Sequence, residues 1–131
     1  MTTATTYLLD ASPLIQAKRT YYGFDFCPAF WDALVRGHEQ GRVFSIDRVK
    51  AELDPGKDEL TNWADNVAPA AFFLDSKTRT VANEFAPLME WVQSQDQFFD
   101  AAKNEFARTD IADGWLIATA KAHGMTVVTH E

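Results

Sequence analysis

The C-terminal stretch, residues 109–131, constrains the fold more than any other part of the chain. Apolar residues recur at helical spacing over 111–122 and predict a buried helix. Gly124 favours the end of that helix, because glycine adopts a positive φ without the steric cost that other residues meet. Residues 125–128 are apolar and mostly β-branched, which is typical of a strand inside a parallel sheet. The stretch therefore predicts half of a βαβ-type unit.

The rest of the chain repeats this alternation of short apolar strands and amphipathic helices. We expect strands over 5–9 and 43–46, with a strand or a buried turn over 70–74. Ser12 and Pro13 are expected to open a helix after the first strand, as N-cap and first helical residue. Further helices are expected over 29–40, 47–53 (capped by Asp47), 59–66, 76–92 (capped by Ser76, with a kink at Pro87) and 96–107. The pattern predicts one α/β domain over residues 1–131, doubly wound, with a central parallel sheet and helices on both faces.

Composition narrows the functional classes. The chain has a net charge of −7, and all of it lies in residues 58–131, because residues 1–57 carry equal numbers of acidic and basic side chains. An acidic chain is a poor non-specific nucleic-acid binder, so a polyanion would have to approach the neutral half or a bound metal ion. There is one cysteine, no basic leader, no apolar run that could span a membrane, and no glycine-rich nucleotide motif or G-x-S-x-G. We expect a cytoplasmic protein without membrane contact.

Acidic residues stand at the ends of the predicted strands and the starts of the predicted helices: Asp10, Glu52, Asp110, Asp113 and Glu131. A parallel sheet brings such positions to one edge, where ligands bind. Clustered carboxylates repel one another unless a cation neutralises them, and all-oxygen ligands suit Mg²⁺ or Mn²⁺. Four of these acids also have plain structural explanations: a turn for Asp10, solvation at the edge of a buried stripe for Glu52, a helix cap for Asp110, and helix-dipole stabilisation for Asp113. The argument for a metal site therefore rests on the whole set.

Four segments of the chain resemble, in order and spacing, the motifs of PIN-domain nucleases: YLLDASPLI, VKAEL, ADGWLIATAKAHG and TVVTHE. PIN-domain nucleases include the toxins of VapBC-type toxin–antitoxin pairs. The segments FSIDRVKAEL, ADGWLIATA and VVTHE are most similar to those of the PIN-like subgroup called DUF4411. The resemblance spans nearly the whole chain.

The resemblance implies a metal-dependent endoribonuclease that binds Mg²⁺ or Mn²⁺. It assigns catalysis and metal binding to Asp10, Glu52, Asp113 and Glu131. Ser12 and Thr129 match small hydroxyl positions that support the site, and Asp110 is a second-tier candidate. The chain departs from the family in two ways: its last acid is Glu where Asp is commoner, and it ends at Glu131 where the family usually continues. We therefore treat the domain as either shortened or truncated at its C-terminus.

Substrate and partner expectations follow from the charge distribution and the resemblance. Lys18, Arg19, Arg48 and Lys50 are the predicted contacts for RNA phosphates. An antitoxin protein is expected to bind across the aromatic stretch 21–26 and the helix that begins near Ala29. Packing of these aromatic side chains at the edge of the core is the alternative explanation for the stretch. The family also admits a homodimer. Two rival functions remain open: a non-catalytic PIN-like binding module, and a Mg²⁺-dependent phosphatase-type domain, which the absence of a second acid two residues after Asp10 disfavours.

Overall fold

The computed structural model describes residues 5–19, 27–56, 58–95 and 112–129. These residues form four strands, β1 (Tyr7–Leu9), β2 (Val43–Ile46), β3 (Phe73–Leu74) and β4 (Thr126–Val128). They also form six α-helices, α1 (Ala11–Arg19), α2 (Pro28–Glu39), α3 (Asp47–Leu53), α4 (Glu59–Asn62), α5 (Arg79–Ser94) and α7 (Ala112–His123). Short helical turns of other types connect them over Asp54–Gly56, Trp63–Val67 and Ala70–Phe72.

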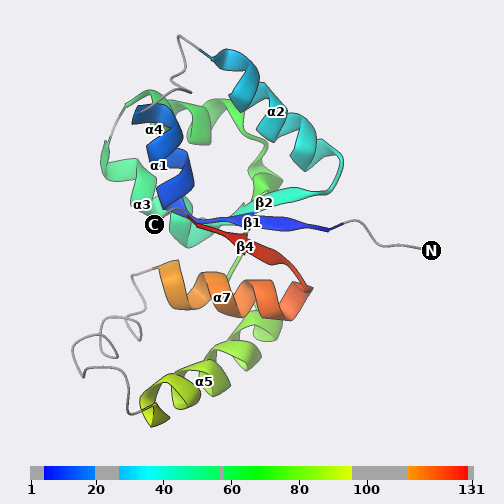
Figure 1. Cartoon of the computed structure of the whole chain (residues 1–131), viewed down its shortest axis with the longest axis vertical. Helices are drawn as coiled ribbons and strands as arrows, with labels where there is room; N and C mark the ends of the chain where they lie inside the picture. The colour runs from blue at the N-terminus through cyan, green and yellow to red at the C-terminus, as the bar shows by residue number, and fades with distance from the viewer. Residues whose placement is uncertain (1–4, 20–26, 57, 96–111, 130–131) are drawn as a thin grey trace.

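The four strands make one parallel sheet in the order β3-β2-β1-β4. Helices α1, α2 and α4 lie on one face, α7 covers the other, and α5 packs on the outer side of α7 (Figure 1). Helix α3 lies at the ends of the strands and contacts both α1 and α7. This confirms the predicted doubly wound α/β fold, in which short apolar strands are buried between helical layers. Within these residues, no helix is long and apolar enough to cross a lipid bilayer.

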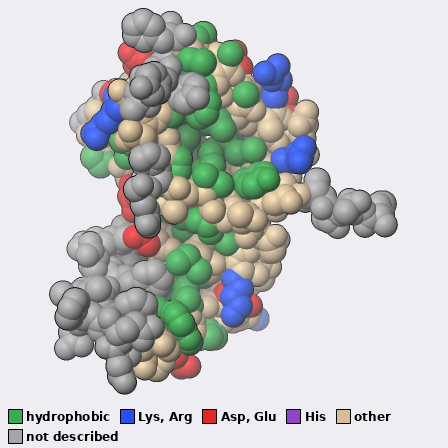
Figure 2. All heavy atoms as spheres, in the orientation of Figure 1, with side chains coloured by type: hydrophobic (Ala, Val, Ile, Leu, Met, Phe, Trp, Pro, Cys, Tyr) green, Lys and Arg blue, Asp and Glu red, His purple; other side chains and the backbone are tan. Residues whose placement is uncertain are grey.

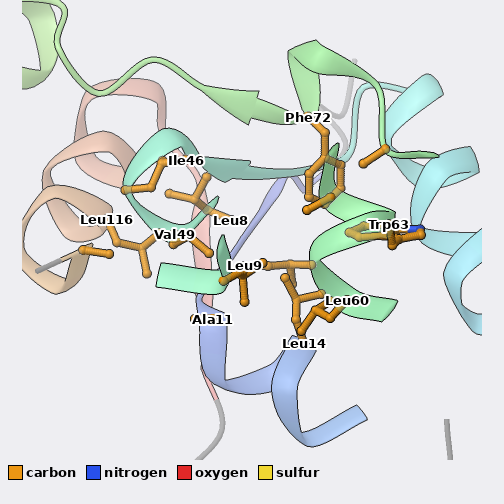
Figure 3. Close-up of a cluster of buried hydrophobic side chains, with 14 of the residues drawn as sticks. Leu8, Leu9, Ala11, Leu14, Ile46, Val49, Leu60, Trp63, Phe72 and Leu116 are labelled. Carbon is orange, nitrogen blue, oxygen red and sulfur yellow. The ribbon is translucent and has the colours of Figure 1, made fainter. Parts of the chain in front are cut away.

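The hydrophobic core joins the sheet to both helical layers. Leu8, Ile46 and Phe72 are fully buried, and the indole of Trp63 packs edge-on against Phe72 with ring centroids 5.6 Å apart (Figure 3). On the other side of the cluster, Leu116 of α7 is 3% exposed and reaches into the same core. Burial of such side chains stabilises the fold by about 1.5–3 kcal/mol each.

Most predicted elements are confirmed, with shifted boundaries. The first strand begins at Tyr7 and not at Thr5, and the segment over 70–74 is a helical turn followed by the two-residue strand β3. The helix predicted over 59–66 is α4 followed by a π-helical turn to Val67. Gly124, with φ of 66°, ends α7 as expected. The helix predicted over 96–107 lies outside the described residues.

Three predicted helix caps were wrong. Helix α1 begins at Ala11, so Ser12 is its second residue and not its cap. Helix α3 begins at Asp47 itself, after Ile46 as cap. Thr78, and not Ser76, caps α5, accepting a hydrogen bond from the N–H of Val81 at 3.3 Å. Pro87 lies inside α5 without dividing it.

Candidate active site

The carboxyl ends of β1 and β4 meet at the point where the strand order reverses. The chain leaves β1 toward β2 on one side, while β4 pairs with β1 on the other side. Open parallel sheets bind ligands at such switch points. Asp10 follows β1 directly, and its backbone N–H donates to the carbonyl of Val128 in β4 at 3.0 Å. Asp10 therefore stands at the position that the fold favours for a ligand.

Two hydroxyl groups hold the Asp10 carboxylate. Its Oδ2 accepts hydrogen bonds from Thr129 Oγ1 at 3.1 Å and from Ser12 Oγ at 3.4 Å, and these two hydroxyls lie 3.3 Å apart. Its Oδ1 accepts from the N–H of Ala11 at 2.7 Å. Donors on both oxygens fix the orientation of the carboxylate. The structure therefore brings Ser12 and Thr129 to Asp10, although 119 residues separate Thr129 from it.

Glu52 approaches the same edge from the last turn of α3. Its Oε1 accepts a hydrogen bond of 2.9 Å from the backbone N–H of Ala112, the first residue of α7. Partial burial raises the pKa of the Glu52 carboxyl, and the negative charges of Asp10 and Asp113 raise it further, while the bond from Ala112 opposes them. The carboxylate thus lies within electrostatic reach of both aspartates.

Asp113 is the residue after Ala112 and lies, exposed, in the first turn of α7. The start of α7, the start of α1 and the helix α3 all lie to the left of the sheet in Figure 1, where β1 and β4 end. Acidic side chains are visible at the same edge of the molecular surface (Figure 2). Three separate elements therefore supply the acids Asp10, Glu52 and Asp113 to one end of the sheet.

The chemistry of these donors fits a hard divalent cation. They are all carboxylates, which suit Mg²⁺ or Mn²⁺ better than Zn²⁺, and a cation would offset the repulsion that Glu52 experiences. Among the residues described, no group of three or more His, Cys, Asp or Glu side chains is close enough together to hold a metal ion as it stands. The fourth predicted ligand, Glu131, and the second-tier candidate Asp110 lie outside the described residues.

The four predicted RNA contacts lie in three different environments. Lys18 and Arg19, at the end of α1, line a pocket of about 130 Å³ together with Ile15, Glu52, Leu53 and Asp58. Lys18 forms an ion pair there with Asp58, the cap of α4. Lys50 instead pairs with Asp65 at 3.3 Å and lines another pocket. The guanidinium of Arg48 lies over the indole of Trp115, 4.2 Å from the ring centroid.

A polar cluster around the buried Ser76 was not anticipated from the sequence. Asp47 Oδ1 accepts from the hydroxyl of Ser76 at 2.6 Å and from its N–H at 3.2 Å. Ser76 is fully buried, and its Oγ also accepts from Nε of Arg48 at 3.0 Å. Asp47 and Ser76 both stand just beyond the carboxyl ends of strands. The reasoning that singled out Asp10 could have found them.

The fold and this edge define a doubly wound α/β protein with carboxylates gathered at the switch point of its sheet. The chain belongs to the family described as Domain of unknown function (DUF4411), which matches residues 7–131. No curated protein and no solved structure gives a significant match. Family membership confirms the DUF4411 part of the resemblance.

Proposed function

We propose that this protein is a PIN-like, Mg²⁺- or Mn²⁺-dependent endoribonuclease that acts in the cytoplasm. One observation carries the proposal: the Glu52 carboxylate is hydrogen-bonded at 2.9 Å to the residue preceding Asp113, within reach of the charge of Asp10. Carboxylates from three elements at a switch point are suited to divalent-cation chemistry on a phosphodiester. The matches to the PIN motifs fall on these same acids.

In the proposed mechanism, Asp10, Glu52 and Asp113 would hold the metal ion, and Glu131 would complete the set. A bound Mg²⁺ or Mn²⁺ supplies an acidified water and charge stabilisation for phosphodiester hydrolysis. Ser12 and Thr129 orient the Asp10 carboxylate through the hydrogen bonds at its Oδ2. Lys18 and Arg19 line the pocket next to Glu52, which makes them the preferred contacts for the phosphates that flank the cleaved bond.

The matching experiment uses a mixed RNA pool. Cleavage is expected with millimolar Mn²⁺ and is expected to stop with EDTA or in Asp10→Asn. Lys121→Met is the control, because Lys121 pairs with Glu84 at 3.4 Å between α7 and α5, outside the proposed site. RNA that stays intact with every divalent ion tested would favour the rival function, a non-catalytic binding module.

We further propose that the protein is the toxin of a type II toxin–antitoxin pair. The predicted antitoxin contacts at 21–26 lie outside the described residues, whereas the adjoining helix α2 begins at Pro28. Co-expression with the product of an adjacent small gene should yield a stable complex and relieve growth inhibition. A protein that is harmless when expressed alone contradicts the toxin assignment but leaves the nuclease assignment standing.

A further inference from the structure

Arg48 links three parts of the fold through contacts that depend on its shape. Its Nε donates to Ser76 Oγ at 3.0 Å, on the segment that follows β3. Its guanidinium carbon lies 4.2 Å from the centroid of the Trp115 ring, on α7. A planar guanidinium can donate at its edge and stack by its face at the same time, which the ammonium group of lysine cannot do.

The two surfaces that hold Arg48 are themselves fixed. The Trp115 ring stacks on Phe85 of α5, with centroids 3.9 Å apart and planes 9° from parallel. The hydroxyl of Ser76 donates to Asp47 Oδ1 at 2.6 Å, and Ser76 is fully buried. Movement of Arg48 would therefore disturb a packed ring pair or a buried hydrogen bond.

Arg48 and Glu52 lie four residues apart on α3 and project from the same side of that helix. Their contacts on α7 are spaced in the same way, because Glu52 meets Ala112 and Arg48 meets Trp115, three residues later. Helix α3 therefore contacts α7 at two points, one helical turn apart. Each contact limits the freedom of the other.

We propose that Arg48 is a positioning residue that holds α3 against Trp115 and thereby keeps Glu52 at the start of α7, beside Asp113. The inference rests on the proposed function, because the purpose of this geometry is to present Glu52 and Asp113 to one metal ion. It assigns Arg48 a role different from the phosphate contact that the sequence suggested. Groups that orient metal ligands commonly change metal affinity by about 10–100-fold when they are removed.

The test measures the Mn²⁺ dissociation constant by isothermal titration calorimetry for the wild type, Arg48→Lys, Arg48→Met and the control Lys121→Met. Removing a positive charge near a cation site should strengthen cation binding on electrostatic grounds alone. We expect the opposite for Arg48→Met, a weakening of about tenfold. Arg48→Lys should weaken binding similarly, since it keeps the charge but loses the planar fork. Lys121→Met should stay within about twofold of the wild type, because its charge is distant and screened.

A second measurement follows the contact without metal. Ala112 is the first residue of α7, and its N–H has no acceptor inside the helix. Its protection from hydrogen exchange therefore reports the bond to Glu52. We expect Arg48→Lys and Arg48→Met to lose this protection while far-ultraviolet circular dichroism stays unchanged. If Arg48→Met does not fold, Ser76→Ala is the second variant, because it removes the acceptor of Nε together with the hydroxyl that donates to Asp47. Ser76→Ala should weaken Mn²⁺ binding in the same direction.

The outcomes separate the inference from the proposed function. One outcome is an unchanged Mn²⁺ affinity in both Arg48 variants, together with a raised KM for RNA and a weaker dependence of RNA binding on salt. This outcome would make Arg48 a phosphate contact, and it would overturn the inference but not the proposed function. A wild type that binds no divalent ion would overturn the proposed function, and with it the metal-presenting purpose. In that case, lost protection at Ala112 would still support the positioning of Glu52 by Arg48. Retained protection of the Ala112 N–H in the Arg48 variants would overturn the positioning role as well.

Discussion

Glu52 accepts a hydrogen bond from the backbone N–H of Ala112, a residue 60 positions further along the chain. The first N–H groups of a helix have no intrahelical acceptor, so the Glu52 carboxylate serves as a cap for α7 that comes from another helix. The same carboxylate experiences the charges of Asp10 and Asp113. One side chain thus connects the packing of α3 on α7 with the acidic edge of the sheet.

The stability of the metal-free protein should depend on pH through Glu52. Burial first, and the charges of Asp10 and Asp113 next, hold the pKa of Glu52 above its ordinary value. The folded protein therefore keeps a proton there at pH values where the unfolded chain has lost it. The contribution of the Glu52 proton to the stability of the fold is fully present below the pKa that Glu52 has in the unfolded chain. It is lost as the pH rises through the pKa that Glu52 has in the folded protein.

Glu52→Gln measures this effect, because glutamine keeps an acceptor for the N–H of Ala112 and removes the charge. In urea unfolding without metal, the free energy of unfolding of the variant should rise relative to that of the wild type as the pH rises above the ordinary glutamate range. The difference between the two free energies should shrink in acid. Asp58, whose pKa its hydrogen bond with Lys18 lowers, loses its stabilising contribution in acid in both proteins, so it cancels in the comparison. A difference in stability that does not vary with pH would contradict the prediction.

Divalent metal should stabilise the fold. An ion that binds only the folded state adds about 2.7 kcal/mol at one hundred times its dissociation constant. We expect Mn²⁺ or Mg²⁺ to raise the melting temperature of the wild type, and the rise should be much smaller in the Asp10→Asn/Asp113→Asn double variant. NaCl at the same ionic strength controls for non-specific salt effects, because Na⁺ is monovalent and binds carboxylates weakly. An equal rise in the double variant would place the ion elsewhere.

Asp10→Asn should abolish RNA cleavage and preserve the fold. Asparagine keeps the volume and an oxygen that can accept from the N–H of Ala11, now seen at 2.7 Å, but it removes the charge that is proposed to bind the metal ion. Relief of repulsion with Glu52 should leave the metal-free variant at least as stable as the wild type. Asp10→Ala, which also removes the acceptor, should cost about 1 kcal/mol. Thermal unfolding and RNA cleavage, measured together, distinguish these cases.

The sequence predicted the parts of the fold that depend on local patterns. The apolar runs that became β2 and β4 and the end of α7 at Gly124 all follow from hydrophobic periodicity and backbone preference. The position of Asp10 at a ligand-binding edge also follows, because a strand and a helix flank it. Such features need only neighbours along the chain.

Features that depend on distant contacts could not be read from the sequence. Ser76 looked like a helix cap, but Asp47, which is 29 residues earlier, binds it in the interior. The phosphate contact predicted for Arg48 rests on its charge alone, whereas its contact with Trp115 depends on packing that the sequence does not show. The sequence alone does not distinguish a basic side chain that faces solvent from one that packs on an indole ring. Only the packing of α3 on α7 decides between these roles.

The hydroxyl of Thr129 offers a test with a matched control on the same strand segment. Thr129 Oγ1 donates to Asp10 Oδ2 at 3.1 Å, whereas the exposed Thr126 contributes its backbone N–H to the carbonyl of Thr6 at 2.9 Å. Thr→Val conserves shape and β-branching and removes only the hydroxyl. Thr129→Val should therefore weaken Mn²⁺ binding and slow RNA cleavage by about tenfold, as expected for the loss of a group that orients a metal ligand. Thr126→Val should leave both unchanged. Equal behaviour of the two variants would show that the Thr129 hydroxyl does not support the Asp10 carboxylate in function.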